Sequence, residues 1–298
     1  MNAATEFSNA LSQAVEKASA ATVLVDARRR YPASGIVFDQ DLVLTADHVV
    51  TREEGIRVRT GSNQQFEASI AGRDPGSDLV VLRLRAPGPE KAVFSGNLPK
   101  VGQLVLALGR PGDGGVQASW GIVTSIGGPA RTGRGGLLDQ YIQSETTPYP
   151  GFSGGPLIDT EGSVVGLNTS GLTRGSSLTI PTAVALRIGH ALAKDGTVKR
   201  GYLGIRTQQV DLDQSAAEAP GLKQNSGLLV VWIEADGPAA RGGLLVGDIL
   251  VGIGGRAVED PDDIFVALSG DTVGKPIDVR VLRGGHAQTL RVSVGMRK

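Results

Sequence analysis

The turn around Ser153 holds the first side chain whose surroundings suit chemistry. Ser153 stands between glycines in residues 151–157, Gly-Phe-Ser-Gly-Gly-Pro-Leu, directly before an apolar run. Glycine adopts backbone conformations that other residues avoid, so this turn can expose the hydroxyl and direct backbone N–H groups inward. In a glycine-rich β protein most such turns are ordinary hairpins. The turn therefore indicates a nucleophile only if a base and a carboxylate accompany it.

A serine hydroxyl is a poor nucleophile at neutral pH and needs an adjacent base, which is usually an imidazole. The chain has three histidines, His48, His190 and His286. His48 follows the apolar run at 42–44, where a strand end can face a cleft. His190 falls within a helical pattern, and His286 falls within a Gly-Gly-His turn. We therefore select His48 as the candidate base, with a purely structural hydrogen-bonded histidine as the alternative.

The base in turn needs a carboxylate that holds its tautomer. Asp78 enters the apolar run Leu-Val-Val-Leu at 79–82. A carboxylate is costly to bury without a partner, and an imidazole would supply one. Asp74, before a proline, and Asp47, beside the histidine, are alternatives that suit a turn and a local cap. Asp78 is therefore the candidate orienting carboxylate.

The composition limits the class of protein. The 298 residues suggest about two domains, and the 40% hydrophobic content suffices for a real core. Thirty basic residues balance thirty acidic ones, which removes the electrostatic case for nucleic acid or an anionic membrane as main partner. With no cysteine, disulfides, thiolate metal sites and a cysteine nucleophile are excluded. We expect no cofactor and no metal.

The elements that must position these groups are mostly strands. Short β-rich runs punctuated by glycine, proline and aspartate fill residues 21–171 in two groups, a spacing typical of a sandwich or barrel. Helical spacing is predicted at 1–20 and 181–195, and the glycine- and arginine-rich segment 127–136 is predicted to be a loop rather than a strand. Residues 194–201 are the best linker candidate.

The last 90 or so residues again alternate strand patterns with two helix signals. Helices are predicted at 238–241 and at 260–270, where the second has a capping aspartate, proline at the first position and a terminal glycine. The longest apolar run, 228–233, is far shorter than the roughly 20 residues of a membrane span. No leader pattern is present at the N-terminus. As written, the chain is expected in the cytoplasm; a missing upstream leader would place it in the cell envelope or periplasm.

His48, Asp78 and Ser153 stand in this order within Thr-Ala-Asp-His, Asp-Leu-Val-Val-Leu and Gly-Phe-Ser-Gly-Gly-Pro-Leu. In these motifs the sequence resembles the chymotrypsin-like serine proteases, and it is most similar to the HtrA/Deg family, over about residues 5–296. The resemblance implies a mainly β fold, with two six-stranded β-barrels followed by an α+β PDZ domain. The implied boundaries are an N-terminal helical segment at 1–20, the protease domain at 21–196 and the PDZ domain at 197–298.

The resemblance also implies the roles of the site residues. Ser153 would be the nucleophile, His48 the general base and then acid, and Asp78 the residue that orients His48. The backbone N–H groups of Gly151 and Ser153 would form the oxyanion hole. Phe152 departs from the family pattern, which usually has asparagine beside the nucleophile, so a collapsed resting oxyanion hole is one expectation.

The expected specificity pocket lies on two segments of the second barrel. By the resemblance, its wall is formed by the two residues that stand five and six positions before the serine, together with three residues on a later strand. These are Thr147, Pro148, Asn168, Thr169 and Ser170. An aspartate at the pocket base would select lysine or arginine, and none stands at these positions. The prediction is cleavage after small or medium apolar residues in unfolded protein.

The C-terminal region resembles a PDZ domain that receives peptide C-termini. Residues 202–205, Tyr-Leu-Gly-Ile, look like the carboxylate-binding loop, in which consecutive N–H groups bind the carboxylate and the peptide adds as a strand. The predicted peptide-binding residues are Tyr202, Leu203, Gly204, Ile205, Ile264, Phe265 and Leu268, although at least half of the helix residues fit a core role equally well.

The expected partners are therefore unfolded protein substrates and peptide C-termini, together with further copies of the chain. The family implies a trimer formed through the N-terminal segment, with Phe7 as a contact. We also expect a peptide on the PDZ domain, or substrate in the cleft, to order residues 127–136. The alternative is a non-proteolytic peptide-binding chaperone or scaffold with the same fold, against which the intact His48, Asp78 and Ser153 argue.

Overall fold

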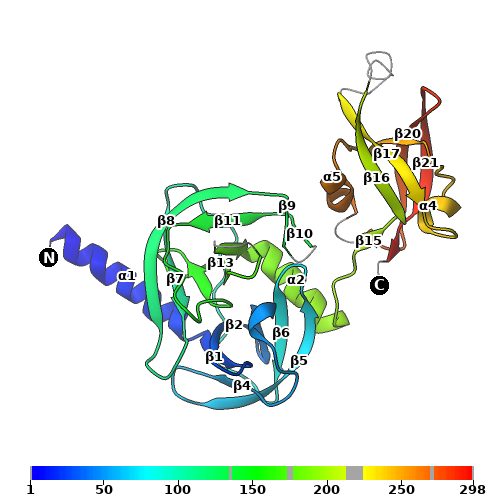
Figure 1. Ribbon diagram of the computed structural model, residues 1–298. Helices are drawn as coiled ribbons and strands as arrows, with labels where there is room; N and C mark the ends of the chain where they lie inside the picture. The colour runs from blue at the N-terminus through cyan, green and yellow to red at the C-terminus, as the bar shows by residue number, and fades with distance from the viewer. Residues whose placement is uncertain (1, 134–135, 173–176, 213–223, 269–271, 297–298) are drawn as a thin grey trace. The chain divides into compact units, whose positions relative to one another are not determined.

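The computed structural model describes residues 2–133, 136–172, 177–212, 224–268 and 272–296. The chain divides into two compact units, Met1–Val198 and Lys199–Lys298. Among the described residues, the first unit contains two closed barrels and two long helices, and the second contains a larger sheet, the two-stranded sheet β15-β22 and two short helices (Figure 1). A mainly β fold with two six-stranded barrels is confirmed.

The first barrel closes six antiparallel strands in the order β1-β2-β3-β6-β5-β4. They are β1 (Thr22–Asp26), β2 (Ala33–Asp39), β3 (Leu42–Ala46), β4 (Ile56–Arg59), β5 (Gln65–Asp74) and β6 (Leu79–Leu84). Alternate residues of a strand face opposite sides of its sheet. Val37 and Val43 accordingly pack in one apolar cluster, while Ile36 and Leu44 pack in another. Both faces of these strands are therefore buried.

The second barrel closes its strands in the order β11-β14-β13-β12-β7-β8. They are β7 (Leu104–Gly109), β8 (Gln117–Gly127), β11 (Tyr141–Ser144), β12 (Pro156–Ile158), β13 (Val164–Thr169) and β14 (Leu178–Pro181). Between β8 and β11, Ala130–Arg131 (β9) pairs with Leu137–Leu138 (β10). The prediction that 127–136 contains no strand is therefore wrong at Ala130–Arg131. This short strand forms because it pairs with Leu137–Leu138, and the surrounding glycines gave no sign of that pairing in the sequence.

Two helices pack on the barrels. α1 (Ala3–Ser19) is capped by Asn2, whose side chain accepts the Thr5 N–H, and its last turns bury Ala14 and Ala18. α2 (Thr182–Asp195) lies against β5, β6 and β13 and ends at Gly196, which adopts a left-handed conformation. Both helices share an apolar cluster with residues of both barrels. The N-terminal half of α1 is exposed and extends away from the barrels (Figure 1).

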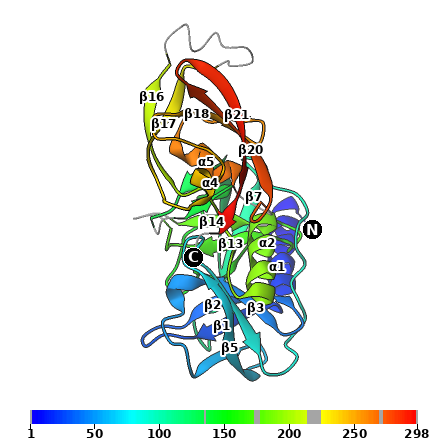
Figure 2. The same cartoon turned by 90° about the vertical axis from the view of Figure 1, so that its right-hand side faces the viewer.

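The second unit is built on the sheet order β16-β17-β18-β20-β21, with its strands side by side in Figure 2. The strands are β16 (Ile205–Asp211), β17 (Ser226–Ile233), β18 (Ile249–Ile253), β20 (Pro276–Arg283) and β21 (His286–Ser293); the short strands are β15 (Gly201–Tyr202), β19 (Arg256–Ala257) and β22 (Gly295–Met296). β16 is the first strand of this order, so one of its edges carries no neighbouring strand among the described residues.

The described part of the second unit also has two short helices, α4 (Pro238–Arg241) and α5 (Pro261–Ala267). The Asp260 side chain caps α5 by accepting hydrogen bonds from the N–H groups of Asp262 and Asp263. The Asp263 side chain in turn accepts one from the Asp260 N–H. The predicted helix start is confirmed, while the predicted end at 269–270 lies outside the described residues. No helix within the described ranges has both the length and the apolar character needed to cross a membrane.

Candidate active site

His48 and Asp78 meet because their strands are neighbours in the first barrel. β3 leads into a 3-10 turn, Asp47–Val49, that carries His48, and Asp78 precedes β6, which pairs with β3 at Ala46 and Leu79. His48 Nδ1 lies 2.7 Å from Asp78 Oδ2, and the His48 backbone N–H donates to Asp78 Oδ1 at 2.9 Å. The carboxylate thus holds both the ring and the backbone of the histidine.

The Asp78 carboxylate is kept ionised despite its burial. Its side chain is fully buried, which acts to raise the pKa, but hydrogen bonds and charge from His48 and the Thr169 hydroxyl outweigh that effect and hold the pKa below its usual range. Because an ionised carboxylate only accepts hydrogen bonds, His48 Nδ1 must carry the proton. Nε2 of the neutral imidazole is then free to accept one.

Asp78 has a left-handed backbone, with φ of 56°. Aspartate and asparagine are among the few residues that adopt this region with little cost. The conformation belongs to the tight turn after Pro75, whose carbonyl accepts the Asp78 N–H. The turn therefore directs the carboxylate toward the ring and backbone N–H of His48.

The turn that carries Ser153 connects β11 to β12 and is pressed against the first barrel. A Cβ added at Gly154, where φ is 86°, would overlap the Ser34 carbonyl and the Thr45 hydroxyl. Ser34 donates its hydroxyl to the Gly151 carbonyl at 2.7 Å and its N–H to the Ser153 carbonyl at 3.2 Å. Glycine is thus required at 154 because the two barrels approach there.

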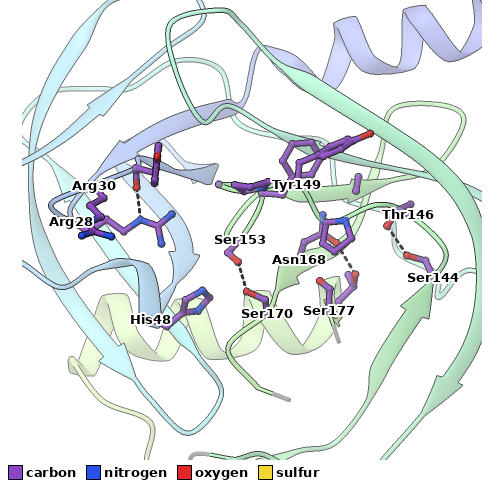
Figure 3. Close-up of a pocket in the computed structure, with 17 residues that line it drawn as sticks. Arg28, Arg30, His48, Ser144, Thr146, Tyr149, Ser153, Asn168, Ser170 and Ser177 are labelled. Atoms are coloured by element: carbon purple, nitrogen blue, oxygen red, sulfur yellow. Dashed lines mark hydrogen bonds between the residues drawn. The ribbon is translucent and has the colours of Figure 1, made fainter. Parts of the chain in front are cut away.

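Ser153 Oγ lies 3.1 Å from Ser170 Oγ. Among the described residues it forms no hydrogen bond with His48, although both side chains line one cavity. Figure 3 shows the Ser153 hydroxyl turned toward Ser170 with the His48 ring beside it. The structure therefore places His48 and Ser153 at one cleft, with the buried Asp78 bonded to His48, and it joins only His48 and Asp78 by a hydrogen bond.

The Phe152 side chain, beside the candidate nucleophile, is buried in an apolar environment. Its ring is 1% exposed and packs with the interior of the second barrel, including Val105, Ile142 and Leu157. Tyr149 contacts it edge-on at 5.4 Å between ring centroids. Apolar burial therefore anchors the turn at the position where the family usually has asparagine.

The two backbone donors predicted for the oxyanion hole are the N–H groups of Gly151 and Ser153. Neither donates a hydrogen bond to any described residue, whereas the Phe152 N–H between them donates to the Tyr149 carbonyl at 3.0 Å. Gly151 has φ of 89°, a conformation suited to glycine. Two backbone donors thus remain available beside the Ser153 hydroxyl.

The cleft around Ser153 is a cavity of about 640 Å³. Of the five residues predicted for the specificity pocket, Pro148, Asn168 and Ser170 line it, and Thr147 and Thr169 do not. The Thr169 side chain instead points to Asp78, and Thr147 is exposed and accepts the Ser119 hydroxyl on its carbonyl. The alternation of side chains along β13 separates Thr169 from its two neighbours.

Several lining residues were not predicted. They are Arg28, Arg30, Tyr31, Ala107, Ser144, Thr146, Tyr149, Pro150, Ser177 and Thr179. The serine and threonine hydroxyls of this set bond within the protein: Thr179 donates to Asn168 Oδ1 at 2.7 Å, Ser177 donates to the Thr169 carbonyl at 3.1 Å, and the Ser144 and Thr146 hydroxyls bond to each other. The run of three arginines at 28–30, in a short connection between apolar strands, is the signal in the sequence that could have indicated Arg28 and Arg30.

The weaker candidates have structural roles. Asp47 is buried and pairs with Arg73, whose Nε donates to it at 2.7 Å. Asp74 accepts the Ser77 hydroxyl at 2.6 Å within the turn before Asp78. His190 packs edge-on against Phe38 on α2. The described residues contain no group of three or more metal-ligating side chains that could hold a metal ion.

The residues predicted to bind a peptide carboxylate lie between β15 and β16 of the second unit. Tyr202 ends β15 and Ile205 begins β16, while Gly204 has φ of 78°. The N–H groups of Leu203 and Gly204 donate no hydrogen bond to any described residue, although their carbonyls accept from Ala239 and Glu234. Adjacent free N–H groups are the arrangement that binds a carboxylate.

The predicted peptide-binding side chains divide between surface and core. Leu203 and Leu268 are buried in the apolar cluster of the second unit, and Ile205 and Ile264 are partly buried against it. Phe265 is 36% exposed. α5, which carries Ile264 and Phe265, contacts β16, the first strand of the sheet order.

Comparison with known proteins gives a consistent result. The family model described as "Trypsin-like peptidase domain" matches residues 33–167, and the model described as "PDZ domain" matches residues 201–294. A protein of Ectopseudomonas mendocina named "Probable periplasmic serine endoprotease DegP-like" is 36% identical over 272 residues, covering 88% of this chain and 56% of that protein. A protein of the same name from Brucella suis is 34% identical over 272 residues, covering 88% and 52%. The chain thus spans about half the length of these relatives.

Solved structures resemble the chain over nearly its whole length. A structure of the "HtrA-type protease AlgW with decapeptide" has a TM-score of 0.80 and 27% sequence identity, covering 97% of this chain and 99% of that one. The "serine endoprotease from Yersinia pestis" has a TM-score of 0.76 and 28% identity, covering 97% and 98%.

Proposed function

The chain belongs to the HtrA/Deg family of serine proteases, and from this premise we propose that it is an endopeptidase that cleaves unfolded or misfolded proteins. The observation that carries the proposal is the buried His48–Asp78 pair beside the Ser153 hydroxyl in one cleft. A decayed enzyme would have no physical reason to keep a buried carboxylate under a histidine.

The proposed reaction begins with attack of Ser153 Oγ on the carbonyl carbon of the scissile bond. His48 Nε2 takes the hydroxyl proton as the C–O bond forms, and Asp78 stabilises the resulting imidazolium. The carbonyl oxygen becomes an oxyanion, which the N–H groups of Gly151 and Ser153 would bind. Each such donor typically contributes about 3 kcal/mol to transition-state stabilisation.

The second half of the cycle releases both products. His48 gives its proton to the leaving amine nitrogen as the C–N bond breaks, which leaves an acyl group on Ser153. Water then attacks the acyl carbon and gives a proton to His48 Nε2, and the proton returns to Ser153 Oγ as the C–O bond breaks. Before each cycle Ser153 must exchange its bond to Ser170 for one to His48.

For the residue before the cleaved bond, we propose a small or medium apolar side chain. Three properties of the cavity support this preference. No lining residue is acidic, so lysine or arginine would have no counter-ion. The hydroxyls of Ser177 and Thr179 already donate within the protein, and the exposed rings of Pro148 and Pro150 add apolar surface.

The second unit is proposed to bind peptide C-termini and so deliver substrate or regulate turnover. The free N–H groups of Leu203 and Gly204 suit the carboxylate, and the free edge of β16 suits addition of the peptide as a strand. Two hydrogen bonds link residues 127–136 to the turns near the site: the Thr132 hydroxyl donates to the Gly76 carbonyl, and the Gly133 N–H donates to the Leu172 carbonyl. Ordering of that segment would therefore act on the turns beside Asp78 and Ser170.

The proposal includes a homotrimer and a periplasmic location. The 44% exposed ring of Phe7 on the projecting half of α1 supports association through this helix. The relatives named as periplasmic favour the cell envelope over the cytoplasm. Substitution of Phe7 by glutamate is expected to lower the mass in solution, measured by light scattering.

The test of the function is hydrolysis of unfolded casein by this chain and by Ser153→Ala, with the cut sites mapped by mass spectrometry. The proposal predicts fragments only from the unaltered chain, with cuts chiefly after small or medium apolar residues. Cuts chiefly after lysine or arginine would contradict the pocket assignment. If neither protein cuts but both suppress aggregation, the chain is a non-proteolytic chaperone with this fold.

A further inference from the structure

Two arginines face the cleft from the connection between β1 and β2. Arg28 and Arg30 line the same cavity as His48 and Ser153, and Arg29 between them does not. None of the residues that line this cavity is acidic. The cleft therefore carries two fixed positive charges and no negative charge on its wall.

Neither arginine is neutralised within the described part of the chain. Arg28 donates to the backbone carbonyls of Tyr31 and Pro32, and burial lowers its pKa with no carboxylate to oppose the effect. Arg30 is exposed and forms no ion pair or hydrogen bond with a described residue. A guanidinium without a counter-ion in a cleft attracts carboxylates, which it binds through two parallel hydrogen bonds.

The arginines lie on one side of the nucleophile. Figure 3 shows Arg28 and Arg30 on the His48 side of Ser153, with Asn168, Ser144 and Thr146 on the other. His48 must give its proton to the leaving amine, so the residues after the cleaved bond lie on the His48 side. The side chain before the bond then enters the part of the cavity around Asn168.

We propose that Arg28 and Arg30 form a subsite for an acidic side chain in the first few residues after the cleaved bond. The inference rests on the proposed function, because it assigns substrate residues to the two sides of the nucleophile. It adds a second determinant of specificity to the apolar residue before the bond. The selected segments would thus combine a small apolar residue with a following aspartate or glutamate.

The test uses internally quenched peptides with the same residues before the cleaved bond and either glutamate or glutamine at the three positions after it. Both end in a C-terminal amide. A third peptide has glutamine at these positions and a free C-terminal carboxylate shortly after them, which separates a side-chain carboxylate from a chain terminus. The quantity measured is the ratio of kcat/KM for the glutamate and glutamine peptides.

The unaltered chain should prefer the glutamate peptide, and Arg30→Gln should lower the ratio about two- to fivefold, as expected for one exposed ion pair. Arg30→Lys should restore part of the preference. Arg29→Gln, in the same connection but outside the cavity, is the matched control and should leave the ratio unchanged. Raising the salt to about 1 M, where the Debye length is about 3 Å, should remove the preference.

A binding measurement separates this inference from the proposed function. The Ser153→Ala variant should bind the glutamate peptide more tightly than the glutamine peptide by fluorescence anisotropy. If the unaltered chain cleaves nothing while this preference in binding persists, the function is wrong and the subsite stands. If it cleaves both peptides with a ratio of one, or if Arg30→Gln leaves the ratio unchanged, the subsite is wrong. A preference confined to the peptide with the free C-terminus would also overturn the side-chain assignment.

Discussion

Ser153 Oγ lies 3.1 Å from Ser170 Oγ instead of bonding to His48. Because the proposed nucleophile must give its proton to the imidazole, the Ser170 hydroxyl competes with the proposed base, His48, for the Ser153 hydroxyl. The structure thus contains the His48–Asp78 hydrogen bond of the proposed triad, whereas Ser153 bonds to Ser170.

Removal of the competing hydroxyl should raise the reactivity of Ser153. A hydrogen bond contributes about 0.5–1.5 kcal/mol net, so Ser170→Ala should react with a fluorophosphonate about two- to tenfold faster. The rate of covalent labelling, followed by intact mass, measures this directly. Ser95→Ala, a serine outside the cavity, should react at the unaltered rate. Slower labelling of Ser170→Ala would mean that this hydroxyl assists the nucleophile.

Asp78→Asn should abolish most turnover and leave the fold intact. Asparagine accepts the left-handed backbone of this position, but its amide N–H would face His48 Nδ1 and favour the wrong tautomer. We expect kcat to fall about 10⁴-fold, as in comparable triads. A circular dichroism spectrum that matches the unaltered chain is the control. A loss of less than about tenfold would remove Asp78 from the proposed mechanism.

The lowered pKa of Asp78 predicts an acid dependence of stability. The ionised carboxylate contributes stability that is fully present above the unfolded pKa of about 3.9 and is lost as the pH falls through the lower folded pKa. Urea unfolding of Ser153→Ala, with and without Asp78→Asn, measures the contribution between neutral pH and strong acid. The difference between the two variants should shrink only below about pH 4. A difference that does not change with pH would contradict an ionised Asp78.

Gly171→Ala should disable the histidine by steric contact. A Cβ at this position would lie 2.5 Å from both His48 Nδ1 and Asp78 Oδ2. Cβ atoms in proteins essentially never lie so close to another heavy atom that is not bonded to them. One of the two groups must move, so kcat should fall by at least about a hundredfold. Gly114→Ala, where nothing lies within 4 Å of the added Cβ, is the matched control. Normal turnover in Gly171→Ala would show that the pair tolerates displacement.

Phe152→Ala should destabilise the first unit and loosen the Ser153 turn. Replacing a buried phenylalanine by alanine typically costs about 3–5 kcal/mol, because a cavity remains. Phe152 is 1% exposed within the second barrel, which puts it in this class. The free energy of unfolding from urea titration measures the loss, and Phe152→Leu should lose less than half as much. A change below about 1 kcal/mol in Phe152→Ala would mean that the turn is not anchored by this ring.

The sequence predicts most of the fold and only part of the site. His48, Asp78 and Ser153 each stand in a recognisable local pattern; pairing of β3 with β6 brings the first two together, and the approach of the second barrel places Ser153 at the same cleft as His48. The role of Thr169 at Asp78 could not be predicted, because a one-residue alternation on β13 decides whether its side chain meets the carboxylate or the cavity. The arginines at 28 and 30 were also missed, since the face that a short connection presents depends on how the two barrels meet.

The central claim is that Ser153 is a nucleophile activated by His48, and covalent labelling tests it most directly. The unaltered chain and His48→Ala are treated with a fluorophosphonate, digested and mapped by mass spectrometry. The account predicts one adduct, on Ser153, which forms in the unaltered chain and is nearly absent in His48→Ala. Labelling of another residue, no labelling of the folded chain, or equal labelling of Ser153 in His48→Ala would contradict it.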